Sequence, residues 1–279
     1  MGLGQLRNSY HKAICRQILG YQTAGVPSIA DKGITSSMEL AQGILARMRF
    51  PLSPNPPHRQ RVATLFELFT RDYLEEALDS IHHLRPGEWI ISMYEDAPIF
   101  DQYEYLYQQA QALRRYPRLC ATLKHRLLMP SILMARWPIL DQEVNRDASI
   151  VRGEIAGLTS LRTNSFPEPK SILHAGIFCR WTLQGDRGQN AQIGILNLIR
   201  NRKGNLPHVV AVTAEPLPTR IASLALGTGD LDCVYHFALP ELMEAIREID
   251  NEDQMDMLKT LVEGRRLRDI SDLPFDLAI

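Results

Sequence analysis

Five short runs rich in β-branched and aromatic residues constrain the fold most, because helical patterns separate most of them. Strands that alternate with helices predict an α/β protein with a mixed sheet covered by helices on both faces. The five expected strands are 88–93, 131–136, 173–182, 208–214 and 232–238.

Apolar residues at helical spacing predict the remaining elements. Ser36 and Glu39 have the spacing of a capping box at the start of a second helix. Pro86-Gly87 is expected to end a third helix, and the proline-rich stretch 51–58 is expected to be a linker. The expected helices are 4–19, 36–48, a helix through Phe66 and Ile81, 188–202 and 240–263.

The composition bounds the class of protein. A chain of 279 residues with 45% hydrophobic content can bury a substantial core. Its formal net charge of −1 means that any DNA contact must come from a local patch. The four cysteines form no CxxC pair, which argues against a zinc site or a disulfide framework. No apolar run has the length of a membrane span, and the N-terminus lacks a signal-peptide core, so we expect a cytoplasmic protein without membrane contact.

Common catalytic motifs are missing from the sequence. It has no GxxxxGK[ST] phosphate loop, no GxGxxG after a strand, no HExxH and no GxSxG. These absences argue against a P-loop nucleotide hydrolase, a dinucleotide-dependent enzyme, a zincin protease and an α/β-hydrolase.

Two stretches carry a family resemblance: CRWTLQGDRGQNAQ and the residues after it to 239, and GRRLRDISDLPFDLAI at 264–279. They resemble the NgoMIV-type restriction endonucleases, the branch of the CCGG-cutting type II enzymes that recognises GCCGGC. The resemblance runs from about residue 61 to 279, whereas the first sixty residues match more loosely, with SIAD at 28–31 still fitting.

The resemblance implies a PD-(D/E)xK restriction-endonuclease-like fold with a central mixed five-stranded sheet flanked by helices. It implies one domain over 1–279, in which 1–60 supplies helices and a DNA-reading loop and 61–279 forms the nuclease core. It also implies a homodimer that grips double-stranded DNA, with two dimers joined into a tetramer. The chemistry of the family is Mg²⁺-assisted hydrolysis, in which a lysine assists the attacking water.

The catalytic positions of the family are occupied here by unsuitable residues. The aspartate of the PD motif falls on Ser131, and the glutamate of the later helix falls on Gly194. A serine hydroxyl is a poor Mg²⁺ ligand beside a carboxylate, and glycine offers no ligand at all. The serine and lysine of the SxK motif fall on Phe178 and Arg180, and arginine cannot shed its proton to act as a base. Only a supporting glutamate persists, as Glu67.

Replacement acids are scarce in the sequence. The helix 188–202 contains no aspartate or glutamate. Asp141 and Glu143 match acidic positions outside the catalytic set of the family, which favours a structural role for them. Asp147 and Glu154 fall in a more variable stretch and remain candidates for relocated ligands. We therefore expect no metal site and no cofactor, unless Mg²⁺ binds relocated ligands.

The DNA-reading positions are better preserved. By resemblance, Gln184, Asp186 and Arg187 read the inner CCGG, and Asp31, Gln60 and Arg220 read the outer base pair. Arginine donates two hydrogen bonds to a guanine edge, and aspartate accepts from cytosine amino groups. Five of these six positions match the family in type. Gln184 does not, and because glutamine pairs best with adenine, it predicts relaxed or altered recognition at its base pair.

The sequence therefore predicts a homologue of type II restriction endonucleases that binds a GCCGGC-like duplex site without cutting it. One alternative is an active Mg²⁺-dependent endonuclease with relocated metal ligands, which a metal-dependent cut would reveal. A second alternative is an interaction protein that no longer binds DNA. Such a protein would lack the salt-dependent duplex binding that phosphate contacts produce.

Overall fold

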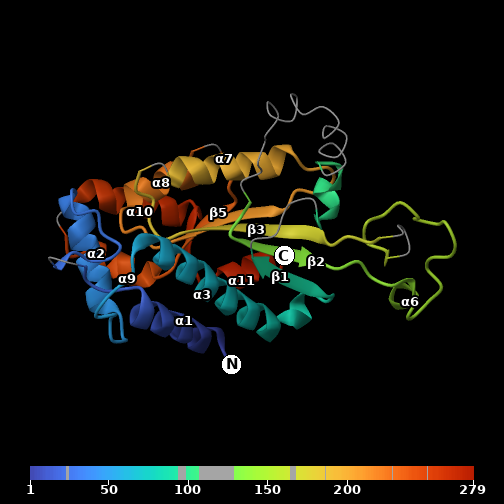
Figure 1. Cartoon of the computed structure of the whole chain (residues 1–279), viewed down its shortest axis with the longest axis horizontal. Helices are drawn as coiled ribbons and strands as arrows, with labels where there is room; N and C mark the ends of the chain where they lie inside the picture. The colour runs from blue at the N-terminus through green and yellow to red at the C-terminus, as the bar shows by residue number, and fades with distance from the viewer. Residues whose placement is uncertain are drawn as a thin grey trace. The chain divides into compact units, whose positions relative to one another are not determined.

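The computed structural model describes residues 1–22, 25–93, 99–106, 129–163, 168–185, 187–227, 229–249 and 251–279 (Figure 1). The chain divides into two compact units. The first unit comprises Met1–Arg85, Ile177–Ile193 and Val209–Ile279, and the second comprises Pro86–Gly176 and Gly194–His208. The expected single domain over 1–279 stays a prediction.

A mixed sheet of six strands confirms the predicted α/β class. β1 and β2 pair antiparallel, with Ile91 opposite Met134, whereas β4, β5 and β6 pair parallel, with Val212 opposite Tyr235. The strand order in the sheet follows the order in the chain. The strands are β1 (Trp89–Met93), β2 (Ile132–Arg136), β3 (Ile172–Arg180), β4 (His208–Thr213), β5 (Cys233–His236) and β6 (Leu267–Asp269).

The predicted number of strands was wrong, because β6 lies in the tail at 264–279. β6 has only three residues, and its burial alternates between buried Leu267 and Asp269 and half-buried Arg268. A strand this short has no recognisable period of its own, so its pairing with β5 defines it.

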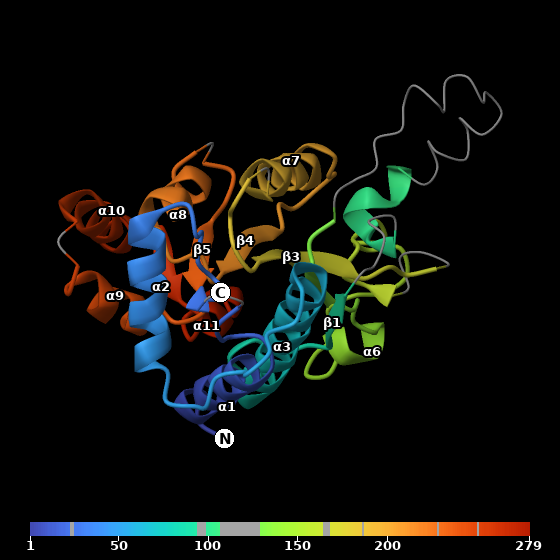
Figure 2. The ribbon, with the colours of Figure 1, turned by 60° about the vertical axis from the view of Figure 1, so that its left-hand side comes forward.

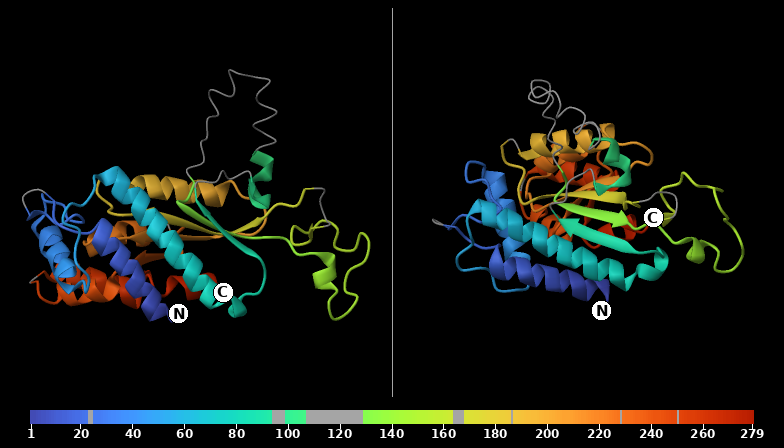
Figure 3. Two further views of the ribbon diagram at one scale, coloured as in Figure 1. Left: turned by 60° about the horizontal axis from the view of Figure 1, so that its bottom comes forward. Right: turned by 45° about the vertical axis from the view of Figure 1, so that its right-hand side comes forward.

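In the first unit, the expected amphipathic helices are present. α1 (Leu3–Gln17) lies beside α3 (Arg59–Ser80), as the two views of Figure 3 show. Tyr10 of α1 is buried against Tyr73 of α3, with ring centroids 5.2 Å apart. The Tyr10 hydroxyl is 3.1 Å from the Thr70 hydroxyl, so the phenol oxygen has a polar partner inside the core.

Two predicted helix boundaries were wrong. α2 (Thr35–Arg47) begins after Ile34 without a side-chain cap, so Ser36 lies inside the helix rather than at a capping box. The neighbouring Ser37 hydroxyl is used elsewhere, since it accepts from the Asp31 amide at 2.9 Å. α3 ends at Ser80, before Pro86-Gly87, because a 3-10 turn, η2 (His82–Leu84), follows it.

The expected helix 240–263 is two helices, α9 (Leu239–Ile246) and α10 (Glu252–Glu263). The break follows from Asn251, whose side chain accepts from the Gln254 amide at 3.2 Å and so caps α10. Figure 2 shows α10 beside α8 (Pro218–Ala225), and α2 packs against α9. The chain ends with α11 (Leu273–Leu277).

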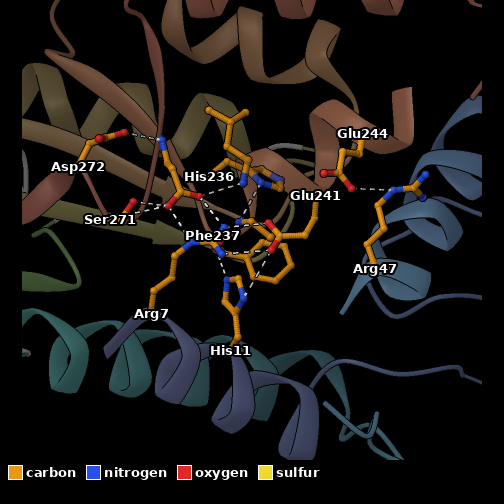
Figure 4. Close-up of polar contacts among 12 residues, drawn as sticks. Arg7, His11, Arg47, His236, Phe237, Glu241, Glu244, Ser271 and Asp272 are labelled. Atoms are coloured by element: carbon orange, nitrogen blue, oxygen red, sulfur yellow. Dashed lines mark hydrogen bonds and ion pairs between the residues drawn. The ribbon is translucent and has the colours of Figure 1, made fainter. Parts of the chain in front are cut away.

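A partly buried ion cluster ties α1 to the C-terminal part of the first unit (Figure 4). Arg7 donates from Nε to Asp269 and from Nη2 to Glu241, each over 2.8 Å. Burial by itself raises the pKa values of both carboxyls, but the hydrogen bonds and charge of Arg7 outweigh it and lower them. His11 lies one turn further along α1, and its Nε2 is 2.7 Å from the carbonyl oxygen of Phe237.

The second unit is organised around β1, β2 and the first half of β3. Gln102, in the 3-10 turn η4 (Asp101–Tyr103), donates to the Leu173 carbonyl at 2.7 Å and accepts from the Leu173 amide at 2.9 Å. Its side chain thereby pairs with both backbone polar groups of Leu173 in β3, as a neighbouring strand would. The Tyr103 hydroxyl donates to the carbonyl of Leu198, which is part of α7 (Arg187–Arg200).

The loop after β2 is held by arginine and asparagine side chains. Arg162 donates from Nε and Nη2 to the two oxygens of Asp141 at 2.7 and 2.6 Å. Asp141 begins the one-turn helix α6 (Asp141–Val144). Asn145 then accepts from the amides of Ile150 and Val151. The loop is therefore shaped by polar contacts, and it leaves several large aliphatic side chains on its outside.

None of the helices in the described ranges is long and apolar enough to cross a membrane. Cys15, Cys179 and Cys233 are buried and form no disulfide among the described residues, and Cys120 lies outside those residues.

Candidate functional site

A hollow of about 240 Å³ lies within the first unit, where the loop after α1, the start of α3 and the end of β3 meet. It contains several of the residues that the sequence analysis selected. It is lined by Gln22, Ser28, Ala30, Pro57, Arg59, Gln60, Val62, Ala63, Glu67, Cys179, Arg180, Trp181, Thr182 and Gln184.

The loop that forms one wall is pinned at its base. The Ser53 amide donates to the Leu19 carbonyl at 2.9 Å, and the Ser28 amide donates to the Gly20 carbonyl at 2.8 Å. A β-carbon at Gly20 would overlap the Ser53 carbonyl oxygen, so only glycine allows this approach. The loop therefore presents Ala30 and Asp31 at a defined place.

Trp181 forms the opposite wall, directly after β3. Its ring is buried and meets Phe66 of α3 edge-on, with centroids 5.1 Å apart. Its Nε1 donates to the Ser28 carbonyl at 3.4 Å, and its carbonyl accepts from the Ala214 amide at 3.1 Å. Trp181 thus fixes the position of the residues after it, which include the expected reading loop.

Two expected reading residues line the hollow. Gln184 donates from Nε2 to the Ala30 carbonyl at 3.1 Å, which joins the two loops next to Asp31. Gln60 is exposed on the first turn of α3. These two amides share one hollow although 124 positions separate them in the sequence (184 − 60 = 124).

The expected outer readers form an ion pair. Arg220 donates from Nη2 to Oδ2 of Asp31 over 2.6 Å. The Gly33 amide donates to the other oxygen of Asp31 at 3.2 Å. The hydrogen bond from Arg220 is the main reason why the pKa of Asp31 lies below its usual value.

Arg220 stands where helix electrostatics disfavour a cation. It lies in the first turn of α8, at the positive end of the helix dipole, and that turn has no acidic residue. Carboxylates from outside the helix compensate: Asp31 at 2.6 Å and Glu215 at 3.7 Å from the guanidinium. The position of Arg220 is therefore not explained by the local stability of α8.

Glu215, which was not predicted from the sequence, is fully buried beside Arg220. Its Oε2 accepts from the Leu183 amide at 2.8 Å, and its Oε1 accepts from the Leu217 amide at 3.4 Å. Burial raises the pKa of the Glu215 carboxyl, against the opposing effect of these bonds and of Arg220. The signal in the sequence is a lone carboxylate directly after the apolar run 208–214, since glutamate is almost never fully buried without partners.

Two further residues, Asp186 and Arg187, are expected to read the inner CCGG. Asp186 lies outside the described residues. Arg187 is the first residue of α7, and its side chain is not described.

The end of β3 carries two residues, Phe178 and Arg180, that were expected at catalytic positions of the family. Arg180 lines the hollow, donates from Nη1 to the Cys179 carbonyl at 2.8 Å and lies 5.9 Å from the Phe178 ring. Phe178 is fully buried, so its side chain belongs to the core rather than to the hollow. Glu67 lines the hollow from α3, and its charge adds to the effect of burial in raising the pKa of the Cys179 thiol.

Comparison with known proteins decides the family. A family model described as NgoMIV restriction enzyme matches residues 10–279. The chain is 40% identical over 282 residues to the type II restriction enzyme NgoMIV of Neisseria gonorrhoeae, which covers 99% of this chain and 98% of that relative. The chain belongs to the NgoMIV restriction enzyme family. The resemblance inferred from the sequence motifs is confirmed.

A solved complex of the restriction endonuclease PspGI with substrate DNA is a more distant neighbour. It is 11% identical, with a TM-score of 0.26, and the match covers 99% of this chain and 92% of that one. At that score we base no conclusion on it, and the assignment to the NgoMIV family depends on the two sequence matches.

The residues at the expected catalytic positions do not have the side chains of a Mg²⁺ site. Ser131 is buried just before β2, and Gly194 is buried on α7; both belong to the second unit. Among the described residues, no group of three or more histidine, cysteine, aspartate or glutamate side chains is placed to hold a metal ion. Both carboxylate oxygens of Asp141 accept hydrogen bonds from Arg162, in agreement with the structural role expected for Asp141.

Proposed function

We propose that this member of the NgoMIV family binds double-stranded DNA at a GCCGGC-like site and does not cut it by the metal-assisted mechanism of the family. One observation carries the proposal. The outer reading pair, Asp31 and Arg220, is assembled and supported, whereas the catalytic positions offer Glu67 as their only carboxylate.

The chemistry of the reading positions supports sequence-specific binding. The Arg220 guanidinium can donate two hydrogen bonds to a guanine edge, and the Asp31 carboxylate can accept from the amino group of the paired cytosine. Gln60 and Gln184 add amides that donate and accept at the same hollow. Because the net charge of the chain is only −1, contacts to bases and to phosphates have to come from local groups of residues rather than from a general positive charge.

The chemistry of the catalytic positions supports the absence of cleavage. Ser131 and Gly194 replace two carboxylates, and a single remaining carboxylate is a weak site for a divalent ion in water. Arg180 keeps a cation at the lysine position but stays protonated, so it cannot take a proton from the attacking water. Phe178 puts a buried aromatic ring where the family has a small polar residue.

The loop 139–163 supports self-association into a dimer or a dimer of dimers. Large aliphatic side chains on it are exposed, up to 89% for Leu158. Exposed aliphatic residues gathered on one segment mark interaction surfaces, and a closed symmetric oligomer covers such a surface with its own copy. The exposed residues of this segment are Leu140, Ile150, Ile155 and Leu158.

A gel shift followed by deproteinisation tests the proposal. A labelled GCCGGC duplex is incubated with the protein and Mg²⁺ against a scrambled competitor, and part of each sample is then deproteinised. We expect a preferred complex, weakened steeply by salt, and intact DNA after deproteinisation. Cleaved product would contradict non-cleavage and favour relocated ligands such as Asp147 or Glu154. Absence of salt-dependent binding would favour an interaction protein.

A further inference from the structure

Glu215 lies at the junction of two chain segments that carry the proposed reading residues. It follows β4 and precedes α8. Its Oε2 accepts from Leu183, the residue directly before Gln184, and its Oε1 accepts from Leu217, the N-cap residue of α8. One side chain therefore holds the segment that leads into the inner reading loop and the start of the helix that carries Arg220.

The backbone around Glu215 makes this connection stiff. The Ala214 amide donates to the Trp181 carbonyl at 3.1 Å, so the two segments are already paired just before Glu215. The Glu215 amide donates to the Thr213 hydroxyl at 3.1 Å, which orients the residue at the end of β4. The hydrogen bond from the Leu183 amide to the Glu215 side chain then continues this pairing beyond the ends of β3 and β4.

Glu215 also acts on Arg220 itself. Nη1 of Arg220 is buried and has no hydrogen-bond partner among the described residues, and it lies 3.7 Å from Oε1 of Glu215. Nη2 is held by Asp31 on the other side. A buried carboxylate thus balances a guanidinium that the helix dipole would repel. The Arg220 guanidinium therefore lies between the carboxylates of Asp31 and Glu215, and not all of its N–H groups are used by them.

Packing alone does not explain a carboxylate at this position. Burying a charged group is unfavourable, and an apolar residue of similar size is often neutral or better for stability where no partner is left unpaired. Here, however, two backbone amides and a guanidinium all face the same carboxyl group. Only a carboxylate offers two acceptors and a negative charge together, because glutamine would turn a donor toward one of the amides.

We propose that Glu215 is a positioning residue that couples the two base-reading elements, the loop that begins at Gln184 and the first turn of α8 with Arg220. The inference rests on the proposed DNA-binding function and deepens it. It has a specific consequence. A change at Glu215 should lower sequence discrimination at two places together: at the outer base pair and at the inner base pair that the loop beginning at Gln184 reads.

The experiment compares Glu215→Gln with a matched control, Asp269→Asn. Asp269 is also a buried carboxylate that accepts backbone amides, from Leu239 and Ser271, and pairs with an arginine, Arg7. It belongs to the ion cluster around Arg7 and is not among the residues that line the hollow. Each protein is titrated with the GCCGGC duplex, with duplexes altered at the outer or at one inner pair, and with a scrambled duplex.

We expect Glu215→Gln to lose about tenfold in discrimination at the outer pair and at an inner pair, while affinity for the scrambled duplex stays unchanged. Asp269→Asn should lower the melting temperature about as much as Glu215→Gln does. It should leave every affinity ratio as in the wild type. A merely structural role of Glu215 predicts that both variants keep the wild-type ratios, and that result would overturn the proposal.

The outcomes separate this inference from the proposed function. If the wild-type protein shows no preference among the duplexes, the proposed function itself is contradicted. If the wild type discriminates and Glu215→Gln discriminates equally, only the coupling is contradicted. If Glu215→Gln does not fold, hydrogen exchange on the wild type decides. The Leu183 and Leu217 amides should then be slowed together by the GCCGGC duplex and not by the scrambled one, and unchanged exchange would overturn the coupling.

Discussion

Arg220 donates from Nη2 to Oδ2 of Asp31 over 2.6 Å, although the two residues are 189 positions apart in the chain. The bond joins the loop after α1 to the first turn of α8. Both side chains remain partly exposed, at 25% and 29%, so the pair can meet a ligand while it stays formed. This geometry suits a donor and an acceptor that read the two bases of one pair.

Replacing Arg220 by glutamine should therefore remove recognition of the outer pair. We expect Arg220→Gln to lower affinity for the GCCGGC duplex by about 5- to 150-fold, the value of one bidentate base contact, with little change for a scrambled duplex. Titration by fluorescence anisotropy measures both. Arg47→Gln is the control, because Arg47 pairs with Glu244 at the surface of the first unit (Figure 4). An equal loss on both duplexes would contradict base reading by Arg220.

Restoring the family's catalytic residues should restore cleavage. We expect Ser131→Asp, Arg180→Lys and Gly194→Glu combined to cut a GCCGGC duplex in Mg²⁺, because the variant regains two carboxylate ligands and a titratable amine. Phe178 is left in place, since truncating a buried phenylalanine costs about 3–5 kcal/mol. Denaturing gel electrophoresis detects the product. The wild type and the three single variants serve as controls, and cutting by the wild type would refute the account of the catalytic positions.

The Arg7 cluster should be important for stability. Arg7→Met leaves Asp269 and Glu241 close together, mostly buried and without their cation, so we expect a loss of about 3 kcal/mol in the free energy of unfolding at neutral pH. Urea denaturation measures it. Lys259→Met removes an exposed pair with Glu263 and should change stability by less than about 1 kcal/mol. Equal stability of the two variants would contradict this role of Arg7.

The same cluster predicts a pH dependence. The pKa values of Asp269 and Glu241 are lowered in the folded protein from their ordinary values of 3.8 and 4.5, so the stabilisation by Arg7 is present above those values. It is lost as the pH falls through the lower folded-state values. The difference in stability between the wild type and Arg7→Met should therefore shrink on acidification, and a difference that stays constant with pH would argue against the ion cluster as its source.

His236 should contribute a second acid-sensitive step. Burial lowers the pKa of His236 from 6.5 to about 4. Between these values the unfolded chain binds a proton that the folded chain does not, so stability falls as the pH drops from 6.5 toward 4. We expect His236→Asn to flatten the stability curve in this window, as measured by urea denaturation at several pH values. His83→Asn, at an exposed histidine after α3, is the control and should follow the wild-type curve.

Leu158 provides a test of self-association. We expect Leu158→Asp to shift the protein toward smaller species in sedimentation velocity, because a charge in a buried apolar interface opposes association. Leu84→Asp is the matched control, since Leu84 is exposed in the 3-10 turn after α3. Unchanged sedimentation of Leu158→Asp would show that this segment does not form the interface.

The periodicity of the sequence predicted most elements correctly because their stabilising contacts follow the period of the element itself. The strands 208–214 and 232–238 and the helix 188–202 were found nearly at their observed bounds. Two errors in helix boundaries occurred where a single side-chain hydrogen bond decides the local structure. Asn251 capped a new helix inside the run 240–263, and Ser37 bonded to Asp31 instead of Ser36 capping α2.

The expected reading positions show the same division. Residue types at Asp31, Gln60, Gln184 and Arg220 were readable from the motif, but their assembly around one loop junction was not, because the partners lie far apart in the chain. Glu215 was overlooked for the same reason, since its role depends on the amides of Leu183 and Leu217.

The sequence by itself determined the family and the α/β class, because these depend on which residues are present and in what order. Only the tertiary structure decided which charges are neutralised and by what. Arg220 stands at the unfavourable end of a helix dipole, and the carboxyl group of Glu215 is fully buried. Either group would be unfavourable alone, and folding makes both acceptable by placing them 3.7 Å apart.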